Sequence, residues 1–115
     1  MKIIKNRDAE IGTNIAICKT IEYSFGDKDL DLGVAVITGR YPESGCCINL
    51  ISKELVYVLE GSGTVCFEND KKVEFEKGDA ILIGNNEKYY WVSKYCKVAM
   101  FCNPAFTVEQ YKLVR

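Results

Sequence analysis

Short apolar runs that alternate with turn-forming residues constrain the fold of this chain more than any other feature. Typical runs are VAVITGRY at about 34–41, CCINLI at about 46–51 and AILI at 80–83. Closely spaced runs of this length, rich in β-branched and aromatic residues, predict a β-sandwich or barrel. Only TVEQYKLV near the C-terminus could be helical, with Thr107 as N-cap and Gln110 as capping-box partner. We therefore predict an all-β fold with at most one short C-terminal helix.

The stretch ELVYVLEGSGTV, residues 54–65, carries the most specific local expectations. LVYVL is apolar at both parities, which predicts a strand buried on both faces. The two glycines of EGSG predict a tight turn, after which TVCFE returns as the hairpin partner. VAMFC, at 98–102, is also apolar at both parities. One face of such strands would line a barrel, and the other needs a cover from a second sheet or a partner subunit.

The composition excludes several classes of function. The 115 residues suit one domain, and the net charge of −1 provides no basic face for direct nucleic-acid binding. No run approaches eighteen apolar residues, so we expect no membrane span, and the charged N-terminal stretch predicts a cytoplasmic protein. Histidine is absent, which removes the commonest general base and the commonest transition-metal ligand.

Residues 39–106 resemble a cupin, the small jelly-roll β-barrel also called a double-stranded β-helix. Glu54 is followed by six residues and then Gly61, as in the first cupin motif. Gly78-Asp79 matches the opening of the second motif, and ILIGNNEKYYW matches its register. The resemblance implies a single cupin domain over residues 1–115 with this motif-bearing core. Small cupins commonly pair, so it also implies a homodimer.

The departures from the cupin motifs concern the metal site. In metal-dependent cupins, three histidines and a glutamate bind a divalent cation inside the barrel. Here the histidine positions fall on Cys47, Asn49 and Tyr89, so that only Glu54 is retained; a register one residue later on the first strand is also open. This mixed set of soft and hard groups without imidazole is poor for a metal. We predict neither a metal nor another cofactor.

The same positions are the candidate ligand site. Alternate residues of a strand share a face, so Cys47 and Asn49 can look into the cavity that receives Glu54. Tyr89 and Trp91 would form an aromatic wall suited to a small polar ring such as a sugar. Further candidates, for the barrel mouth, are Tyr41 and Arg40.

A purely structural role remains open for each of these residues. Glu54 could be a solvated acid at a strand end, Asn49 could satisfy backbone groups, and the aromatic residues could be core. The six cysteines are predicted to pack mostly as buried thiols. Cys46 and Cys47 are adjacent and would point to opposite faces of one strand.

Three functions fit these observations. The first is a metal-independent barrel that binds a small polar molecule, such as a carbohydrate or an organic acid, in a sensory or binding role. The second is a metal-independent sugar isomerase, epimerase or lyase, with Glu54 and Tyr89 as acid and base. The third is a stand-alone ligand-sensing module that resembles the barrel of arabinose-type regulators.

Overall fold

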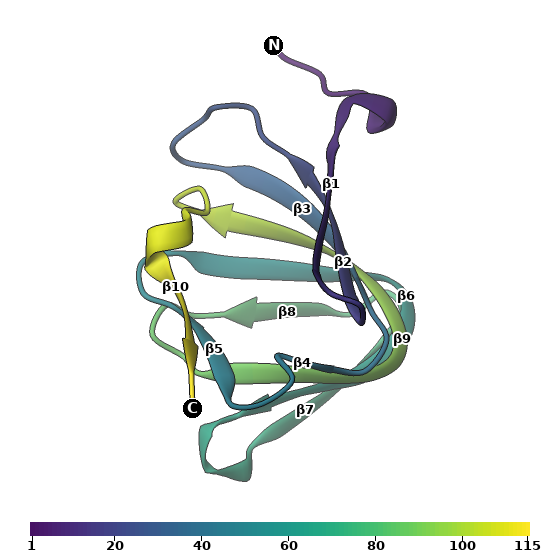
Figure 1. Cartoon of the computed structure of the whole chain (residues 1–115), viewed down its shortest axis with the longest axis vertical. Helices are drawn as coiled ribbons and strands as arrows, with labels where there is room; N and C mark the ends of the chain where they lie inside the picture. The colour runs from purple at the N-terminus through teal and green to yellow at the C-terminus, as the bar shows by residue number, and fades with distance from the viewer.

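The computed structural model describes the backbone of residues 1–115 and every side chain except those of Thr13 and Asn14. Within these residues the strands form one ten-stranded sheet, antiparallel at each pairing, which curls on itself (Figure 1). The all-β prediction is therefore confirmed. No helix in this described part is long and apolar enough to cross a membrane. The strands are β1 (Glu10–Ile15), β2 (Cys18–Tyr23), β3 (Asp31–Ile37), β4 (Arg40–Tyr41), β5 (Cys46–Asn49), β6 (Lys53–Phe67), β7 (Lys72–Glu76), β8 (Ala80–Ile83), β9 (Tyr89–Asn103) and β10 (Tyr111–Val114), with 3₁₀ helices η1 (Asn6–Asp8), η2 (Glu68–Asp70) and η3 (Val108–Gln110).

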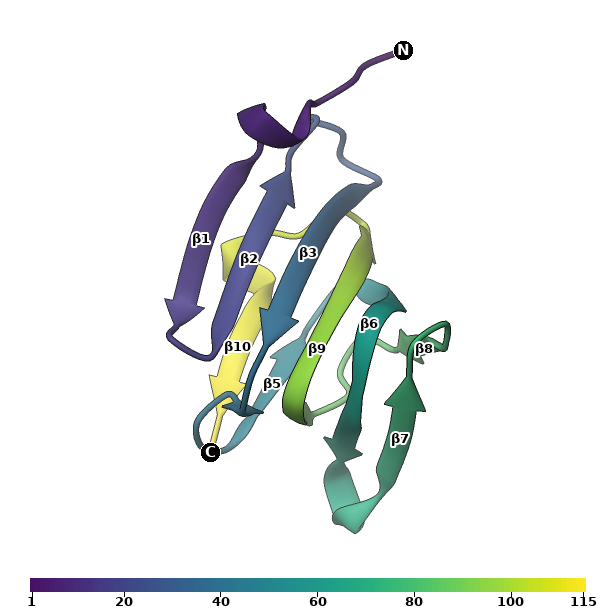
Figure 2. The same cartoon turned by 90° about the vertical axis from the view of Figure 1, so that its right-hand side faces the viewer.

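Two long strands, β6 and β9, hold the barrel together. They pair with each other over nearly their whole length. The second half of β9 also pairs with β3, while its first half pairs with β4 and β5. On its other edge, β6 pairs first with β8 and then with β7. Figure 2 shows β1, β2 and β3 beside β9, with β5 and β10 behind them. Each long strand thus passes from one side of the barrel to the other.

The tight turn predicted at EGSG is wrong, because β6 continues through it. The strand bends there, with register shifts between Val58 and Glu60 and between Ser62 and Thr64. Gly61 has a φ of +79°, and a Cβ at this position would overlap the carbonyl oxygen of Tyr95. Only glycine satisfies both conditions. The spacing from Glu54 to Gly61 therefore leads to a corner within one strand, and TVCFE continues that strand.

The prediction that LVYVL is buried on both faces is also wrong. Val56 and Val58 point into the barrel and are fully buried. Leu55 and Tyr57 point outward, with 48% and 46% of their surface exposed. The strand alternates as any barrel strand does, but its outer positions are apolar as well.

The C-terminal helix predicted for TVEQYKLV shrinks to the single 3₁₀ turn η3. The side chain of Thr107 makes no capping hydrogen bond there. The following residues form β10, which pairs antiparallel with β5 from Tyr111 opposite Asn49 to Val114 opposite Cys46. The open edge of β5 offers these residues backbone partners that a short isolated helix would lack.

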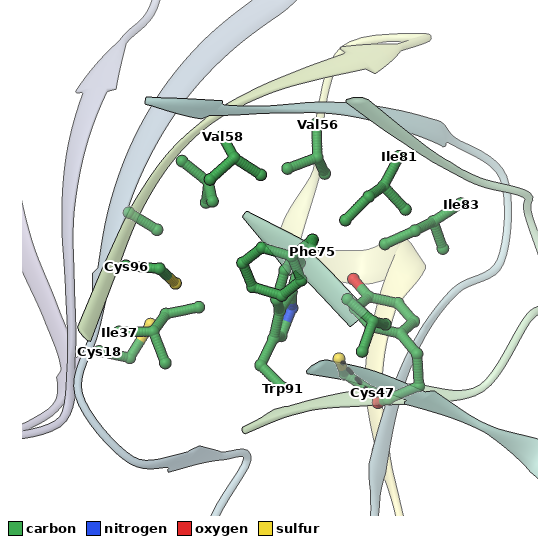
Figure 3. Close-up of a cluster of buried hydrophobic side chains, with 14 residues drawn as sticks. Cys18, Ile37, Cys47, Val56, Val58, Phe75, Ile81, Ile83, Trp91 and Cys96 are labelled. Atoms are coloured by element: carbon green, nitrogen blue, oxygen red, sulfur yellow. Dashed lines mark hydrogen bonds between the residues drawn. The ribbon is translucent and has the colours of Figure 1, made fainter. Parts of the chain in front are cut away.

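The packed core occupies one part of the interior. Phe75 of β7 meets Trp91 of β9 edge to face, with ring centroids 5.6 Å apart. Figure 3 shows both rings beneath Val56 and Val58 of β6. Trp91 contacts this core on one side and lines a cavity on the other. The remaining interior is therefore hollow beyond Trp91.

Candidate functional site

The barrel contains a cavity of about 320 Å³, which lies at the lower end of the range for small-molecule pockets. Five of the six predicted ligand-binding residues line it: Tyr41, Cys47, Glu54, Tyr89 and Trp91. The sixth, Asn49, is buried behind the wall. The structure thus brings together side chains from β4, β5, β6 and β9 that the sequence separates.

Glu54 is the central ionisable group of the cavity. It lies at an inward-facing position of β6, opposite Cys102 of β9, and is 7% exposed. Its Oε2 accepts a hydrogen bond from the Tyr89 hydroxyl at 3.1 Å, and its Oε1 lies 3.8 Å from the Cys102 thiol. Burial raises the pKa of Glu54, and these two hydrogen bonds only partly oppose that effect. The alternative of a solvated surface acid is wrong.

Tyr89 is held between Glu54 and a buried amide pair. Its ring is 3% exposed and stands edge to face with Trp91 at 6.4 Å. Its hydroxyl donates to Glu54 and accepts from Nδ2 of Asn49 at 3.5 Å. Asn49 in turn accepts from Nε2 of Gln110 at 2.9 Å. Burial first, and the charge of Glu54 second, raise the pKa of Tyr89 well above its ordinary value.

Cys47 lines the cavity as a protonated thiol. It is 1% exposed, and its Sγ donates to the backbone carbonyl of Tyr89 at 3.3 Å. Burial raises the pKa of Cys47 to about 12. Cys46 is only half-buried, consistent with adjacent side chains on opposite faces. Cys47 is therefore both core filler and cavity wall.

At the end near Cys47, two tyrosines close the cavity. Their hydroxyl groups, on Tyr41 and Tyr111, lie 3.3 Å apart. Arg40 does not join them, so its predicted place at the mouth is wrong. Its guanidinium stacks on the Tyr90 ring at 3.8 Å and donates to the carbonyl of Gly45 at 3.0 Å. Arg40 thus fixes the loop before β5.

Two acidic residues in the wall were missed by the sequence reasoning. Glu22 of β2 lies over Gly33, where a Cβ would come within 3.0 Å of its carboxylate. Glu22 is exposed overall, but its carboxyl is partly desolvated where it faces the cavity, and this desolvation together with the nearby charge of Asp31 raises its pKa. Asp31 accepts backbone N–H groups of Cys102 at 3.3 Å and Phe106 at 2.8 Å. The period-two alternation along β2, which places Glu22 on the inward face, could have been read from the sequence.

The charges of the cavity wall have one sign. Three carboxyl groups line it, those of Glu22, Asp31 and Glu54. Among the described residues that line it, none is lysine or arginine. The cavity can therefore donate and accept hydrogen bonds, but it has no group to pair with an anion.

Several solved structures share this architecture. No family model matches the sequence, and no curated protein sequence matches it. Pac13, described as a nucleoside dehydratase, superposes with a TM-score of 0.85 at 19% identity, covering 100% of this chain and 92% of Pac13. A point variant of Streptomyces Pac13 with uridine gives 0.85 at 18% identity over 96% of this chain and 88% of that one. Ectoine synthase from P. lautus gives 0.75 at 15% identity, covering 100% and 91%. The polyketide cyclase RemF from Streptomyces resistomycificus gives 0.72 at 16% identity, covering 96% and 89%.

This chain has the cupin fold. The resemblance found in the sequence is confirmed at the level of the fold. Because these identities are below 20% for all the structures just described, activity does not follow from the likeness. The site must be argued from its own chemistry.

The metal site of metal-dependent cupins does not fit the residues of this cupin barrel. Cys47 remains a thiol that donates to a carbonyl, and the Tyr89 proton is directed at Glu54. Asn49 is engaged with Gln110 and Tyr89. Within the part of the chain that the structure describes, no three His, Cys, Asp or Glu side chains are grouped to hold a metal ion. These side chains form hydrogen bonds within the protein instead of presenting free ligand atoms.

Proposed function

We propose that this cupin barrel is a metal-independent enzyme of the lyase or isomerase type, acting on a small neutral hydroxylated molecule by acid–base chemistry. The observation that carries the proposal is the Glu54 carboxyl in the cavity wall, which meets hydroxyl and thiol donors but no cation. Burial raises its pKa, and a carboxyl with a raised pKa can take and return protons near neutral pH.

One carboxyl suffices for such a reaction. In an elimination, ionised Glu54 would take a proton from a ligand carbon, and the electrons of that C–H bond would form a double bond as the neighbouring C–O bond breaks. The protonated carboxyl would then give its proton to the departing hydroxide, which leaves as water. In an isomerisation, the same proton would return to a different ligand atom.

In this proposal Tyr89 is not the second proton donor. Its pKa lies well above the ordinary value because of burial and the charge of Glu54. Its hydroxyl proton is already directed at Oε2 of Glu54. We therefore assign Tyr89 to holding Glu54 in place and stabilising its ionised form.

The charge of the wall supports a neutral ligand over an organic acid. A carboxylate or phosphate would enter beside Glu22, Asp31 and Glu54 without a basic partner in the wall. The rings of Tyr41, Tyr89 and Trp91 offer apolar faces to a small ring. The likeness in fold to a nucleoside dehydratase solved with uridine supports a nucleoside or a sugar as the class to test first.

The test combines binding and proton exchange. Uridine, other neutral nucleosides and monosaccharides are titrated by NMR, with uridine monophosphate as the anionic counterpart of uridine. We expect at least one neutral compound to bind, and its phosphate to bind at least about tenfold more weakly. Proton spectra in D₂O then record exchange of a carbon-bound ligand proton or appearance of an elimination product. Glu54→Gln should keep binding and abolish both signals; unchanged turnover would exclude Glu54 as the acid–base group.

The second candidate is binding without turnover, in a sensory role. Both Glu54 oxygens already interact with protein donors, which suits a fixed recognition surface. A neutral ligand that saturates the site while its protons never exchange would favour this role, including a stand-alone sensor. Homodimerisation and a cytoplasmic location remain predictions under both candidates.

A further inference from the structure

Three buried hydrogen bonds connect Glu54 to a residue behind the cavity wall. Nε2 of Gln110 donates to Oδ1 of Asn49 at 2.9 Å, and Nδ2 of Asn49 donates to the Tyr89 hydroxyl at 3.5 Å. Tyr89 donates to Oε2 of Glu54 at 3.1 Å. Gln110 and Asn49 are 3% and 1% exposed and do not line the cavity. Each member could in principle point its donor either way, so the direction of the chain needs a cause.

Backbone groups determine that direction. Oε1 of Gln110 accepts from the N–H groups of Ile51 and Ser52, each at 3.1 Å. A backbone N–H can only donate, so the amide oxygen of Gln110 must face the backbone and its nitrogen must face Asn49. Asn49 then presents its oxygen to Gln110 and its nitrogen to Tyr89. Since the Tyr89 oxygen already accepts a hydrogen bond from Asn49, its single hydroxyl hydrogen is donated to Glu54.

We propose that Gln110 is a positioning residue: it fixes the direction of this chain, so that Oε2 of Glu54 is always an acceptor and only Oε1 gains or loses the proton. Oε1 accepts only a long 3.8 Å contact from the Cys102 thiol, a weak donor that can also accept from a protonated Oε1, and Glu54 and Cys102 both line the cavity. The carboxyl therefore has one defined acidic oxygen instead of two equivalent ones. The use of that proton in catalysis rests on the proposed function, whereas the direction of the chain does not.

The direction can be tested in the wild-type chain without any ligand. Nuclear Overhauser effects are measured for the side-chain amide protons of Asn49 and Gln110. We expect the Asn49 amide protons to show effects to the Tyr89 ring. A reversed chain would place the Asn49 oxygen toward Tyr89 and its amide protons toward Gln110. Effects to Gln110 without effects to the Tyr89 ring would overturn the proposal.

The role of Gln110 is tested by measuring the pKa of Glu54 from the ¹³C chemical shift of its carboxyl carbon as a function of pH. The signal is assigned as the one that disappears in Glu54→Gln. Gln110→Met frees the Asn49 side-chain amide to flip, so that its oxygen accepts the hydrogen bond of the Tyr89 hydroxyl and Glu54 loses this donor. We expect the pKa of Glu54 to rise in the Tyr89 protein. In a Tyr89→Phe background, the same substitution should leave the pKa of Glu54 unchanged.

Other ionisable groups that face Glu54 do not produce this pattern. Glu22 on β2, Asp31 on β3, Cys47 on β5 and Cys102 on β9 are unchanged by the substitution at 110, and Gln110→Met adds no charge. If Gln110→Met fails to fold, Gln110→Glu keeps the acceptors for the two backbone groups and is titrated in the same two backgrounds; because its added charge can raise the pKa of Glu54 in both, the expected result is a larger rise in the Tyr89 protein. No rise in the Tyr89 protein, or an equal rise in both backgrounds, would overturn the role of Gln110. If the hydrogen bonds run in the proposed direction but the protein turns over no neutral ligand, that result counts against the proposed function alone.

Discussion

At the residue scale, a buried carboxyl is retained at a position that lowers the stability of its own fold. Burial raises the pKa of Glu54, so the folded state keeps its proton over a pH range in which the unfolded chain has lost it. In that range the folded state binds more protons, and the free energy of unfolding must fall as pH rises. A residue kept against stability in a cavity wall is typical of a functional site.

Glu54→Gln should therefore stabilise the fold in a pH-dependent way. Well below the ordinary glutamate value of 4.5, we expect the stability difference between the two proteins to be independent of pH, because Glu54 is protonated whether folded or unfolded. Above it, the variant should become progressively more stable than wild type, until native Glu54 is itself ionised and the difference levels off. Urea unfolding at a series of pH values measures this difference. Glu43→Gln, in an exposed loop, is the control, and a pH-independent difference for Glu54→Gln would contradict the argument.

The adjacent cysteines should differ sharply in reactivity. Cys46 is half-buried, whereas Cys47 is 1% exposed with a pKa raised by burial to about 12. At pH 8 only about one Cys47 in 10⁴ is a thiolate, and the thiolate is the reactive form. Iodoacetamide should thus modify Cys46 in the native protein and Cys47 only after unfolding in urea, as located by fragment mass spectrometry. Equal native labelling of both would show that the wall at Cys47 opens.

At the element scale, the sequence predicted most of the strands as strands but misplaced some of their ends, and it predicted a helix where β10 lies. Two glycines in EGSG signal a positive φ equally in a hairpin turn and in a strand corner, so the corner at Gly61 was taken for a turn. The inward–outward alternation of LVYVL could not be read from the sequence, because Leu55 and Tyr57 are apolar although they face outward. The short YKLV segment is a strand because it pairs with β5, and the local sequence contains no information about that long-range pairing.

Gly61→Ala should weaken the barrel more than alanine at a comparable glycine elsewhere. Gly26 has a similar φ of +74°, against +79° at Gly61, but a Cβ there meets nothing within 4 Å. Gly26→Ala should therefore cost about 1–2 kcal/mol, the strain of a positive φ. Gly61→Ala adds the overlap with the Tyr95 carbonyl and should cost about 1–3 kcal/mol more. Urea unfolding of both variants measures the difference; equal losses would mean that the corner can relax.

At the scale of the whole molecule, the site is a product of the closed barrel. The motif spacing predicted that Glu54, Cys47 and Tyr89 would meet, because each lies on an inward face of a strand. Glu22, Asp31 and Gln110 lie outside the region that resembles the cupin motifs. Alternation along β2 was a sequence signal for Glu22, but Asp31 and Gln110 are placed only by the fold. Since β6 and β9 run across both sides of the barrel, we propose that residues 1–115 form one domain, which should unfold in a single calorimetric transition.

The outer face of the sheet bears on the predicted homodimer. Leu82, Leu55, Phe101 and Leu32 are cross-strand neighbours in one apolar row over β8, β6, β9 and β3. Leu82, Leu55 and Phe101 are 65%, 48% and 39% exposed. Tyr57 lies beside this row on the same face of β6. A contiguous exposed apolar surface of this kind is typical of an interface, and a second copy presents the same row to it.

We expect the chain to be a dimer of two 13.0 kDa subunits joined through this apolar row. Leu55→Glu places a charge in the row, and the charge would be desolvated in the dimer, so it should give monomers at concentrations where the wild type is dimeric. Leu113→Glu is the matched control, because Leu113 is also exposed, at 65%, but lies on β10 on another side of the barrel (Figure 2). Light scattering after size-exclusion chromatography measures the masses. A wild-type monomer at about 100 µM, above the Kd range of stable dimers, would refute the dimer, and dissociation by Leu113→Glu alone would place the interface on β10 instead.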